Sequence, residues 1–534
     1  MADSTDSARP GPRRPGVLLA AAGGVLATLV GMAVGHLVAS ITDPAASPVL
    51  GVGSTVIDLT PTPVKEWAVA NFGTADKPIL IGSVLVVTLL LSAAIGVVAA
   101  RRLRLGLALL VALAVVAGVL VLLRPTSGPL DVVPAVATAV VGAAALWWFL
   151  RAASGLPLRP ARTHGGSGSH DVMDDATPGT TSGGATRRGV LIATGVLAAA
   201  AAVSGAVGQW VTVARTRIGN IALPKPVDAD PPLPDGLDID GISPFRTPND
   251  EFYRVDVNLS VPVVDHESWT LTVDGDVENE LTITFDELLE MDMVERDITM
   301  TCVSNDVGGQ YVGAARWLGV PLTDILDRAG VGDRADQLLS TAVDGFTIST
   351  PLDVATDGRD ALVVVGMNGE PLPRDHGFPV RMIIPGIYGY VGSTKWLTKL
   401  TLTTYADDVA YWTERDWATD APVKISSRID VPKSGAEVDA GEVVIAGVAW
   451  AQTRGIAKVE IQIDGGAWTE VELGADAGVD YWRQWFYRWQ VDEPGRHSFT
   501  VRATDVDGEV QTDVQMRPFP EGSSGLHTRA VMVA

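Results

Sequence analysis

The sequence predicts a multi-span α-helical membrane region, then an α+β domain, then a C-terminal immunoglobulin-like β sandwich. Long uncharged apolar runs fill the first 214 residues, and acidic residues gather in the remainder. Short alternating runs follow one another near the C-terminus. The net charge of −23 therefore belongs largely to the second half, which argues against a nucleic-acid partner because such partners need a basic face.

Five apolar stretches are long enough to cross a bilayer, which takes about 20 residues. They run roughly over 16–41, 79–100, 105–123, 129–150 and 189–214. The first four form a membrane region over 1–150, and the last follows a Gly/Ser/Thr-rich cytoplasmic linker over 151–188.

Arginine sets the orientation of these spans, because basic residues stay on the cytoplasmic side. Arginines cluster before the first span, between the second and third, and between the fourth and fifth: Arg9, Arg13, Arg14, Arg101, Arg102, Arg104, Arg151, Arg159, Arg162, Arg187 and Arg188. If the N-terminus is cytoplasmic, all three arginine clusters lie on the cytoplasmic side of the membrane. We therefore expect a multi-pass protein of the cell membrane whose C-terminal half is extracytoplasmic.

Two features of the membrane half bear on export and cofactors. Arg187-Arg188 before the last span resembles a twin-arginine export signal, and two ordinary positive-inside arginines explain it equally well. His36 is the only histidine in a predicted span, so no haem is predicted within this chain.

In the second half, the composition predicts a Pro/Asp-rich tether over 215–248, followed by two folded domains over 249–415 and 422–534. In the first domain, the pattern predicts helices over 284–289 and 320–329 and strands over 269–273, 381–385 and 397–403. In the second, strands are predicted over 443–450, 458–463 and 497–502, and their regular spacing indicates the sandwich.

Cys302 is the only cysteine of the chain, so it cannot form an internal disulfide. A lone cysteine is most often a small buried hydrophobe. The other interpretation is a thiolate that acts as a nucleophile or a metal ligand. Its own local sequence leaves both open.

Three stretches resemble the sulfite-oxidase family of molybdenum enzymes. They are Asn249-Asp250-Glu251-Phe252-Tyr253-Arg254; Cys302 with Ala315-Arg316-Trp317-Leu318-Gly319-Val320-Pro321-Leu322; and Met367-Asn368-Gly369-Glu370-Pro371-Leu372-Pro373-Arg374-Asp375-His376-Gly377-Phe378-Pro379-Val380-Arg381, followed by Pro385-Gly386, Gly389 and Lys395-Trp396-Leu397. The resemblance covers about residues 245–520 and none of the five spans. It implies that 249–415 is a molybdopterin-binding oxidoreductase domain and that 422–534 resembles the family's dimerisation domain.

The resemblance also implies a molybdenum–molybdopterin cofactor and a set of site residues. Cys302 would be the protein ligand of the metal, since one soft thiolate suits molybdenum. Arg254 would line the substrate pocket. The cofactor would contact Asn249, Tyr253, Thr341, His376 and Arg381, and its phosphate end would lie in the turn Gly392, Ser393, Thr394 and Lys395.

The departures from the family concern the substrate. Sulfite-oxidising members place an arginine pair shortly after the cysteine, where this chain has Asp306 and Val307. The insertion that animal sulfite oxidases carry after the cysteine is absent, since Trp317 follows Cys302 closely. These features are closer to the membrane-anchored bacterial branch that includes the periplasmic methionine-sulfoxide reductase catalytic subunit.

The resulting hypothesis is oxygen-atom transfer on a small sulfur- or nitrogen-centred substrate or a protein sulfoxide. Electrons would be exchanged with a separate partner, a cytochrome or another membrane redox protein, and the resemblance allows a homodimer. The alternative is a non-enzymatic, membrane-anchored binding or interaction protein, which predicts tolerance of Cys302→Ala.

Overall fold

The computed structural model describes residues 15–61, 64, 67–68, 71–72, 75–124, 127–154, 184–215, 218–219 and 221–534. The chain divides into two compact units. The first comprises Met1–Arg217 with Asn258–Val263, and the second comprises Ile218–Val257 with Val264–Ala534. Most of the predicted linker, and the arginines before residue 15, lie outside the described residues.

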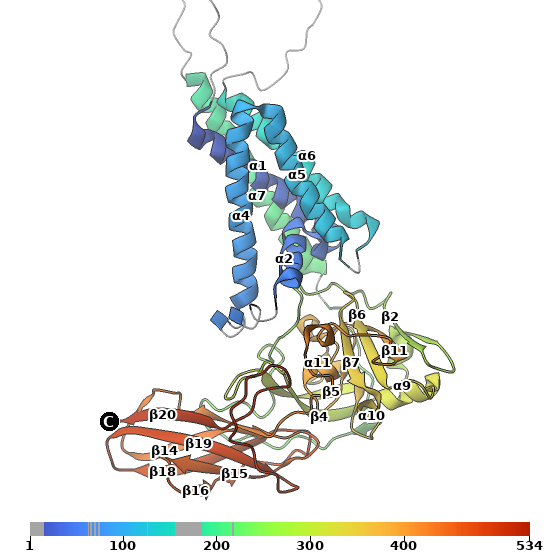
Figure 1. Ribbon diagram of the computed structural model, residues 1–534, viewed down its shortest axis with the longest axis vertical. Coiled ribbons are helices and arrows are strands. Elements are labelled where there is room, and N and C mark those ends of the chain that lie inside the picture. Colours follow the sequence, from blue (N-terminus) through green and yellow to red (C-terminus); the bar gives the residue numbers. More distant parts are fainter. Residues whose placement is uncertain are drawn as a thin grey trace, which may run out of the picture. The chain divides into compact units, whose positions relative to one another are not determined.

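The first unit is built of long helices that run beside one another (Figure 1). They are α1 (Val17–Ile41), α2 (Pro48–Leu59), α4 (Asp76–Arg101), α5 (Leu103–Leu122), α6 (Val133–Ala153) and α7 (Gly184–Arg215), with short 3₁₀ turns at Pro44–Ala46 and Pro129–Val132. Among the described residues, five helices are long and apolar enough to cross a membrane: Val17–Ile41, Lys77–Arg101, Leu103–Leu122, Pro129–Ala153 and Arg187–Arg215. Sequence reasoning did not predict α2, which is too short to span a bilayer.

Small residues let these helices approach closely. A Cβ on Gly24 of α1 would lie 2.0 Å from the carbonyl oxygen of Ser92 and 2.9 Å from the Cα of Gly96, both in α4. At the same crossing the Thr28 hydroxyl donates to the Ser92 hydroxyl at 2.8 Å. Close contact of small residues with an interhelical hydrogen bond is typical of helices packed in lipid.

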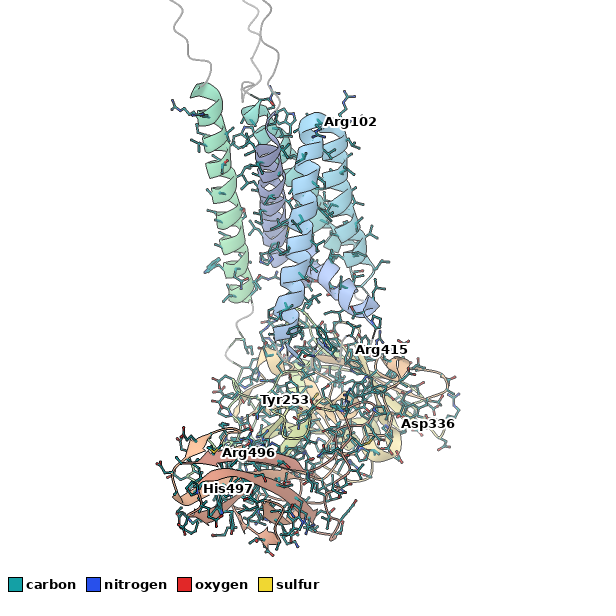
Figure 2. All side chains as sticks on the ribbon, turned by 60° about the vertical axis from the view of Figure 1, so that its left-hand side comes forward. Arg102, Tyr253, Asp336, Arg415, Arg496 and His497 are labelled. Carbon is teal, nitrogen blue, oxygen red and sulfur yellow. The ribbon has the colours of Figure 1, made fainter. Side chains whose placement is uncertain are left out.

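Six arginines lie at one end of the bundle, where Figure 2 labels Arg102. The antiparallel contact of Gly24 with Gly96 puts the end of α4 beside the start of α1, and Gly189 of α7 lies near Ala152 of α6. Arg101, Arg102, Arg104, Arg151, Arg187 and Arg188 are therefore at the same end.

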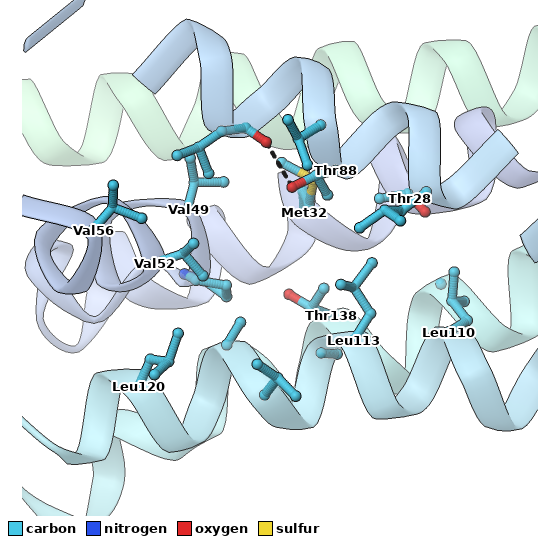
Figure 3. A pocket seen from close by; sticks show the side chains of 18 of the residues that line it. Thr28, Met32, Val49, Val52, Val56, Thr88, Leu110, Leu113, Leu120 and Thr138 are labelled. Carbon is cyan, nitrogen blue, oxygen red and sulfur yellow. Dashed lines mark hydrogen bonds between the residues drawn. The ribbon is translucent and has the colours of Figure 1, made fainter. Parts of the chain in front are cut away.

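A cavity of about 390 Å³ lies among α1, α2, α4, α5 and α6 (Figure 3). Its wall is almost wholly apolar, and Thr28, Ser83, Thr88 and Thr138 contribute hydroxyl groups to it. The hydroxyls of Thr88 and Thr138 donate to carbonyls of their own helices, at Val84 and Pro134. None of the predicted site residues lines this cavity.

The second unit begins with two sheets and short helices (Figure 1). One sheet has the order β1-β4-β5-β8-β10, with β9 paired to β8, and the other has the order β3-β2-β11-β6-β7. The strands of the first sheet are β1 (Asp228–Ala229), β4 (Val294–Thr301), β5 (Val312–Pro321), β8 (Leu362–Met367), β9 (Glu370–Pro371) and β10 (Arg381–Ile383). Those of the second are β2 (Thr270–Gly275), β3 (Leu281–Thr284), β6 (Gln337–Ala342), β7 (Thr347–Pro351) and β11 (Leu397–Thr403). The helices are α8 (Phe285–Leu289), α9 (Leu322–Ala329), α10 (Leu352–Ala355) and α11 (Gly389–Gly392), with 3₁₀ turns at Arg374–His376 and Thr413–Arg415.

The remaining strands form a region that we call the β unit, residues 426–533. Its sheets have the orders β12-β14-β18-β17 and β13-β20-β19-β15-β16. The strands are β12 (Ser426–Val431), β13 (Glu437–Val438), β14 (Gly441–Trp450), β15 (Ile456–Ile463), β16 (Trp468–Glu470), β17 (Glu472–Leu473), β18 (Arg483–Val491), β19 (Gly495–Asp505) and β20 (His527–Val533). Inward side chains of both sheets, such as Ile445, Trp485, Ile461 and Phe499, share one hydrophobic core.

Two predicted elements differ at their ends. The helix predicted over 320–329 begins only at Leu322, because Val320 and Pro321 complete β5 in pairs with Val363 and Leu362. The strand predicted over 381–385 ends at Ile383. The helix predicted over 284–289 spans Phe285–Leu289, because Thr284 is its N-cap, with the Thr284 hydroxyl accepting from the Glu287 backbone N–H in a capping box.

Candidate active site

Cys302 lies directly after β4, at the start of a loop that returns to β5. We call residues 302–311 the Cys302 loop. The Cys302 N–H donates to the Tyr311 carbonyl at 2.9 Å, and the Asn305 N–H donates to the Cys302 carbonyl at 3.0 Å. The thiol is free and only 8% exposed. Burial raises the pKa of Cys302, while hydrogen bonds from Ser304 and the positive charge of Lys395 oppose that shift.

Arg381 is the most enclosed cation of the site. Its Nη1 donates to the His376 carbonyl at 2.9 Å, its Nη2 donates to the Ser393 hydroxyl at 2.5 Å, and its guanidinium lies 5.2 Å from the ring centroid of Trp317. Burial lowers the pKa of Arg381 to about 10, so the group remains charged at neutral pH. Its Nε is buried without a hydrogen-bond partner.

His376 is held as a neutral imidazole. Its Nε2 lies 2.8 Å from the backbone oxygen of Asn249, which can only accept, so Nε2 carries the proton and Nδ1 is left as an acceptor. Burial and the nearby charge of Arg381 lower the pKa of His376 to about 4. The left-handed Gly377 follows at φ +113°, and a Cβ there would lie 3.0 Å from the Arg381 Cβ and 3.1 Å from the Lys395 Cα.

Lys395 and Arg254 share one carboxylate. Lys395 Nζ and Arg254 Nε each lie 2.8 Å from Asp256 Oδ2. Burial lowers the pKa of Lys395 to about 8, although Asp256 opposes the shift. Burial also acts to lower the pKa of Arg254, but Asp256 outweighs it and the net shift is upward.

The predicted phosphate turn, Gly392–Lys395, is held in place by hydrogen bonds from neighbouring strands. Its backbone is held by β10, since Met382 N–H donates to the Thr394 carbonyl and Ile384 N–H donates to the Gly392 carbonyl, both at 2.9 Å. The hydroxyl of Thr394 is fully buried and lies 2.5 Å from that of Ser340. Thr394 therefore supports the turn, while Ser393 contacts Arg381.

Tyr253 joins the group around Cys302. Figure 2 labels it within the second unit. Its ring stacks on Phe252 at 5.2 Å, and burial with the nearby Cys302 raises its pKa, against the effect of Arg381. The hydroxyl thus stays protonated and can donate.

Two residues that were predicted to contact the cofactor, Asn249 and Thr341, differ from the others in where their side chains lie. The Asn249 side chain is engaged by Asn368, whose Nδ2 donates to Oδ1 at 2.8 Å, so Asn249 contributes to the site through its carbonyl to His376. Thr341 follows Ser340 on β6, and successive strand residues point to opposite faces. Its side chain therefore faces away from Thr394, and its role remains a prediction.

Sequence reasoning missed Ser304, Asp256 and Tyr388. Tyr388 is 3% exposed, and burial, with a contribution from Cys302, raises its pKa to about 12. Tyr388 lies within the Pro385–Gly389 part of the motif, and this place in the motif could have indicated that it belongs to the site. Nothing in the local sequence indicates that Asp256 pairs with Lys395, which lies 139 residues away.

These residues fit the predicted cofactor. The cations Arg381 and Arg254 lie near Lys395, and the charge of Lys395 acts on the buried Cys302 thiol. Asp256 pairs with Lys395 and Arg254, and Asp375 lies 3.8 Å from Arg254. The buried, unpaired Nε of Arg381 is a donor that a phosphate or pterin acceptor would satisfy. His376 Nδ1 adds an acceptor for a pterin N–H.

Comparisons with known proteins agree with this chemistry. Residues 258–412 match the family model described as "Oxidoreductase molybdopterin binding domain". Mitochondrial sulfite oxidase of Mus musculus is 30% identical over 340 residues, which cover 54% of this chain and 60% of the relative. Sulfite oxidase of Arabidopsis thaliana is 28% identical over 307 residues, covering 48% of this chain and 76% of the relative.

Among solved structures, the sulfane dehydrogenase SoxCD from Paracoccus pantotrophus matches with a TM-score of 0.48 and 22% identity, over 55% of this chain and 81% of that one. The chain spans about 60% of the length of the first mammalian relatives it matches. Residues 258–412 are therefore a molybdopterin-binding oxidoreductase domain that is similar to the one in sulfite oxidases, with molybdenum–molybdopterin as its cofactor.

Proposed function

We propose that this protein is a membrane-anchored, extracytoplasmic molybdenum oxidoreductase that transfers an oxygen atom to or from a small sulfur- or nitrogen-centred substrate or a protein sulfoxide. The observation that carries the proposal is the buried thiol of Cys302, on which the positive charge of Lys395 acts, together with the buried Arg381, whose Nε has no hydrogen-bond partner. When bound, the cofactor supplies two-electron oxygen-atom transfer at molybdenum.

The residues of the chain then have separate tasks. Cys302 is the metal ligand, and Ser304 donates to its sulfur, which favours the thiolate. Arg381, Lys395 and the turn Gly392–Ser393 hold the phosphate end of the cofactor by charge and N–H donors. His376 stays neutral across physiological pH, so it binds by hydrogen bonding and adds no charge.

The charges near the substrate pocket favour a neutral substrate over sulfite. Arg254 is already paired with Asp256 at 2.8 Å, which weakens its attraction for an incoming anion. Asp306 adds a carboxylate where sulfite-oxidising members have an arginine. Burial raises the pKa of Asp306, and Arg517 opposes that shift. A sulfoxide or an N-oxide fits this balance better than a dianion.

We further propose that the first unit anchors the protein, with its N-terminus in the cytoplasm. Five apolar helices of sufficient length support this, as does the gathering of Arg101, Arg102, Arg151, Arg187 and Arg188 at one end of the bundle. Arg187-Arg188 would serve as a twin-arginine signal for export of an already folded domain. A separate cytochrome or membrane redox protein would exchange electrons with the cofactor, and a homodimer would form through the β unit.

The test is metal and pterin content of the detergent-solubilised protein from cells competent in cofactor synthesis. We expect about one molybdenum per chain in the wild type, as one thiolate implies one metal. Cys302→Ser should alter the spectrum of the bound metal, whereas Thr469→Ala, on the exposed β16 strand, should not. A folded wild type with neither metal nor pterin would overturn the proposal and favour a binding protein.

Substrate class is tested on the loaded protein. Methionine sulfoxide, dimethyl sulfoxide and trimethylamine N-oxide are offered with a reduced dye, and sulfite is offered with an oxidising dye. We expect higher kcat/KM for a neutral oxide than for sulfite. Faster turnover of sulfite would refute the neutral-substrate part while leaving the molybdenum part intact.

A further inference from the structure

Side chains of the β unit hold the Cys302 loop from outside the cofactor-binding domain. Before the loop, Gln452 Nε2 donates to the Thr299 carbonyl at 2.9 Å and to the Thr301 hydroxyl at 3.1 Å. Within it, the Ser523 hydroxyl donates to the Asn305 carbonyl at 2.5 Å. Arg428 Nη1 donates to the Gly309 carbonyl at 2.7 Å. The loop is therefore fastened on both sides of Cys302.

Arg428 also holds the second segment that supplies the site. Its Nη2 donates to the Ser243 hydroxyl at 2.6 Å, and its partner Asp430 accepts from the Ser243 N–H at 2.9 Å. Ser243 lies a few residues before Asn249, whose carbonyl positions His376. The segment is held further where the Trp482 indole donates to the Phe245 carbonyl at 2.8 Å.

Burying the Arg428–Asp430 ion pair costs desolvation free energy. Its side chains are 2% and 4% exposed, with Nε to Oδ1 at 2.7 Å. Desolvation of a buried ion pair commonly cancels its Coulombic gain, so such a pair is weak evidence for added stability. The remaining hydrogen bonds of Arg428 leave the β unit, reaching Gly309 and Ser243 across 119 and 185 residues of chain.

We propose that Arg428 is a positioning residue of the molybdenum site, which sets the place of Cys302 relative to the Asn249–Arg254 segment from the β unit. The inference rests on the proposed function in that it gives Cys302 the role of metal ligand. The planar fork of arginine can hold three partners in fixed directions, whereas an ammonium cannot. The β unit is then a part of the active site and more than an interface for assembly.

The test uses the reactivity of Cys302, which is unambiguous because the chain has one cysteine. In the full-length apoprotein in detergent, we measure the rate of thiol alkylation and amide exchange over 302–311. The variant Arg428→Met with Asp430→Asn removes both charges, so that neither is left buried alone. We expect alkylation about tenfold faster, since losing a buried charged hydrogen bond shifts local opening by about that factor. Arg428→Lys should lie between this variant and the wild type.

The matched control is Arg502→Met with Glu460→Gln. That pair joins two strands of the β unit at 2.9 Å, without a hydrogen bond to the Cys302 loop. We expect wild-type alkylation and exchange from it. If the Arg428 variant fails to fold, Ser523→Ala, which removes only the bond to Asn305, should still raise the alkylation rate and the exchange of the loop.

The loaded protein adds a second readout. We expect the Arg428 variant to bind pterin yet show an altered absorption from the metal–thiolate bond, and the control to match the wild type. Folded variants with unchanged alkylation, exchange and absorption would overturn the inference. A wild type without molybdenum would instead defeat the proposed function, while the alkylation result in the apoprotein would still decide whether Arg428 positions the loop.

Discussion

Lys395 Nζ lies 2.8 Å from Asp256 Oδ2, and this carboxylate also accepts from Arg254 Nε. One acid thus moderates two cations, one assigned to the cofactor and one to the substrate. The side chain of Asp256 is 5% exposed, so both pairings act where water screens little.

Asp256→Asn should destabilise the apoprotein by about 3 kcal/mol, because it leaves the buried Lys395 ammonium without its carboxylate partner. The loss should be smaller once the cofactor phosphate is bound. Asp274→Asn, which breaks the more exposed pair with Lys399, should cost less than about 1 kcal/mol. Thermal unfolding of the apo and loaded proteins checks both, and equal losses in the two variants would contradict the assignment.

His376 should make the protein less stable as the pH falls. Its pKa is about 4 when folded and 6.5 ordinarily, so the unfolded chain binds more protons between these values. The stability it contributes is present above pH 6.5 and is lost toward pH 4, by about 2 kcal/mol between pH 7 and pH 5. Urea unfolding at pH 7 and pH 5 should show a smaller loss of unfolding free energy for His376→Gln than for the wild type. An equal loss in the two proteins would mean that His376 is not held neutral.

Arg381→Lys should lower pterin occupancy about tenfold or more while keeping the positive charge. Lysine cannot reproduce the fork that reaches the His376 carbonyl and Ser393. Arg334→Lys, at a side chain that is 83% exposed, should leave occupancy unchanged. Fluorescence of the oxidised pterin extracted from each variant measures this. Full occupancy in Arg381→Lys would show that charge alone suffices.

Gly377→Ala should perturb the site more than Gly358→Ala, although both glycines have positive φ. A Cβ at Gly377 would press on Arg381 and Lys395, whereas one at Gly358 meets nothing within 4 Å. Each change carries a backbone cost of about 1 kcal/mol or more. Only Gly377→Ala should also reduce molybdenum content, measured per folded chain. Equal metal in both variants would refute the packing argument.

Local patterns predicted much of the secondary structure. Apolar runs longer than a membrane's thickness mark the helices α1, α4, α5, α6 and α7, because length and composition are properties of a single segment. Strict alternation marked β15, and Thr284 marked the start of α8. Many strands were not predicted, among them β4, β5 and β8 in the first sheet and β18 and β20 in the β unit. In β18 and β20, Trp, Arg and His interrupt the alternation.

The motifs likewise predicted Cys302, His376 and Arg381 as site residues from residue type and order alone. Which groups neutralise them could not be predicted. Nothing in the sequence around Asp256 indicates its role, because its partner Lys395 lies 139 residues away and only the fold brings the two together. Ser304 donates to a neighbouring sulfur, yet only the turn of the Cys302 loop aims it there.

The sequence by itself thus determined the membrane-length helices, the resemblance to sulfite oxidases and the lone thiol, because each depends on the identity and order of nearby residues. Tertiary structure alone decided that Asp256 joins two cations, that Thr341 faces away from Thr394, and that Arg428 reaches Gly309. These relationships link residues far apart in the chain. Burial then removes the water that would screen their charges, and gives them their energetic weight.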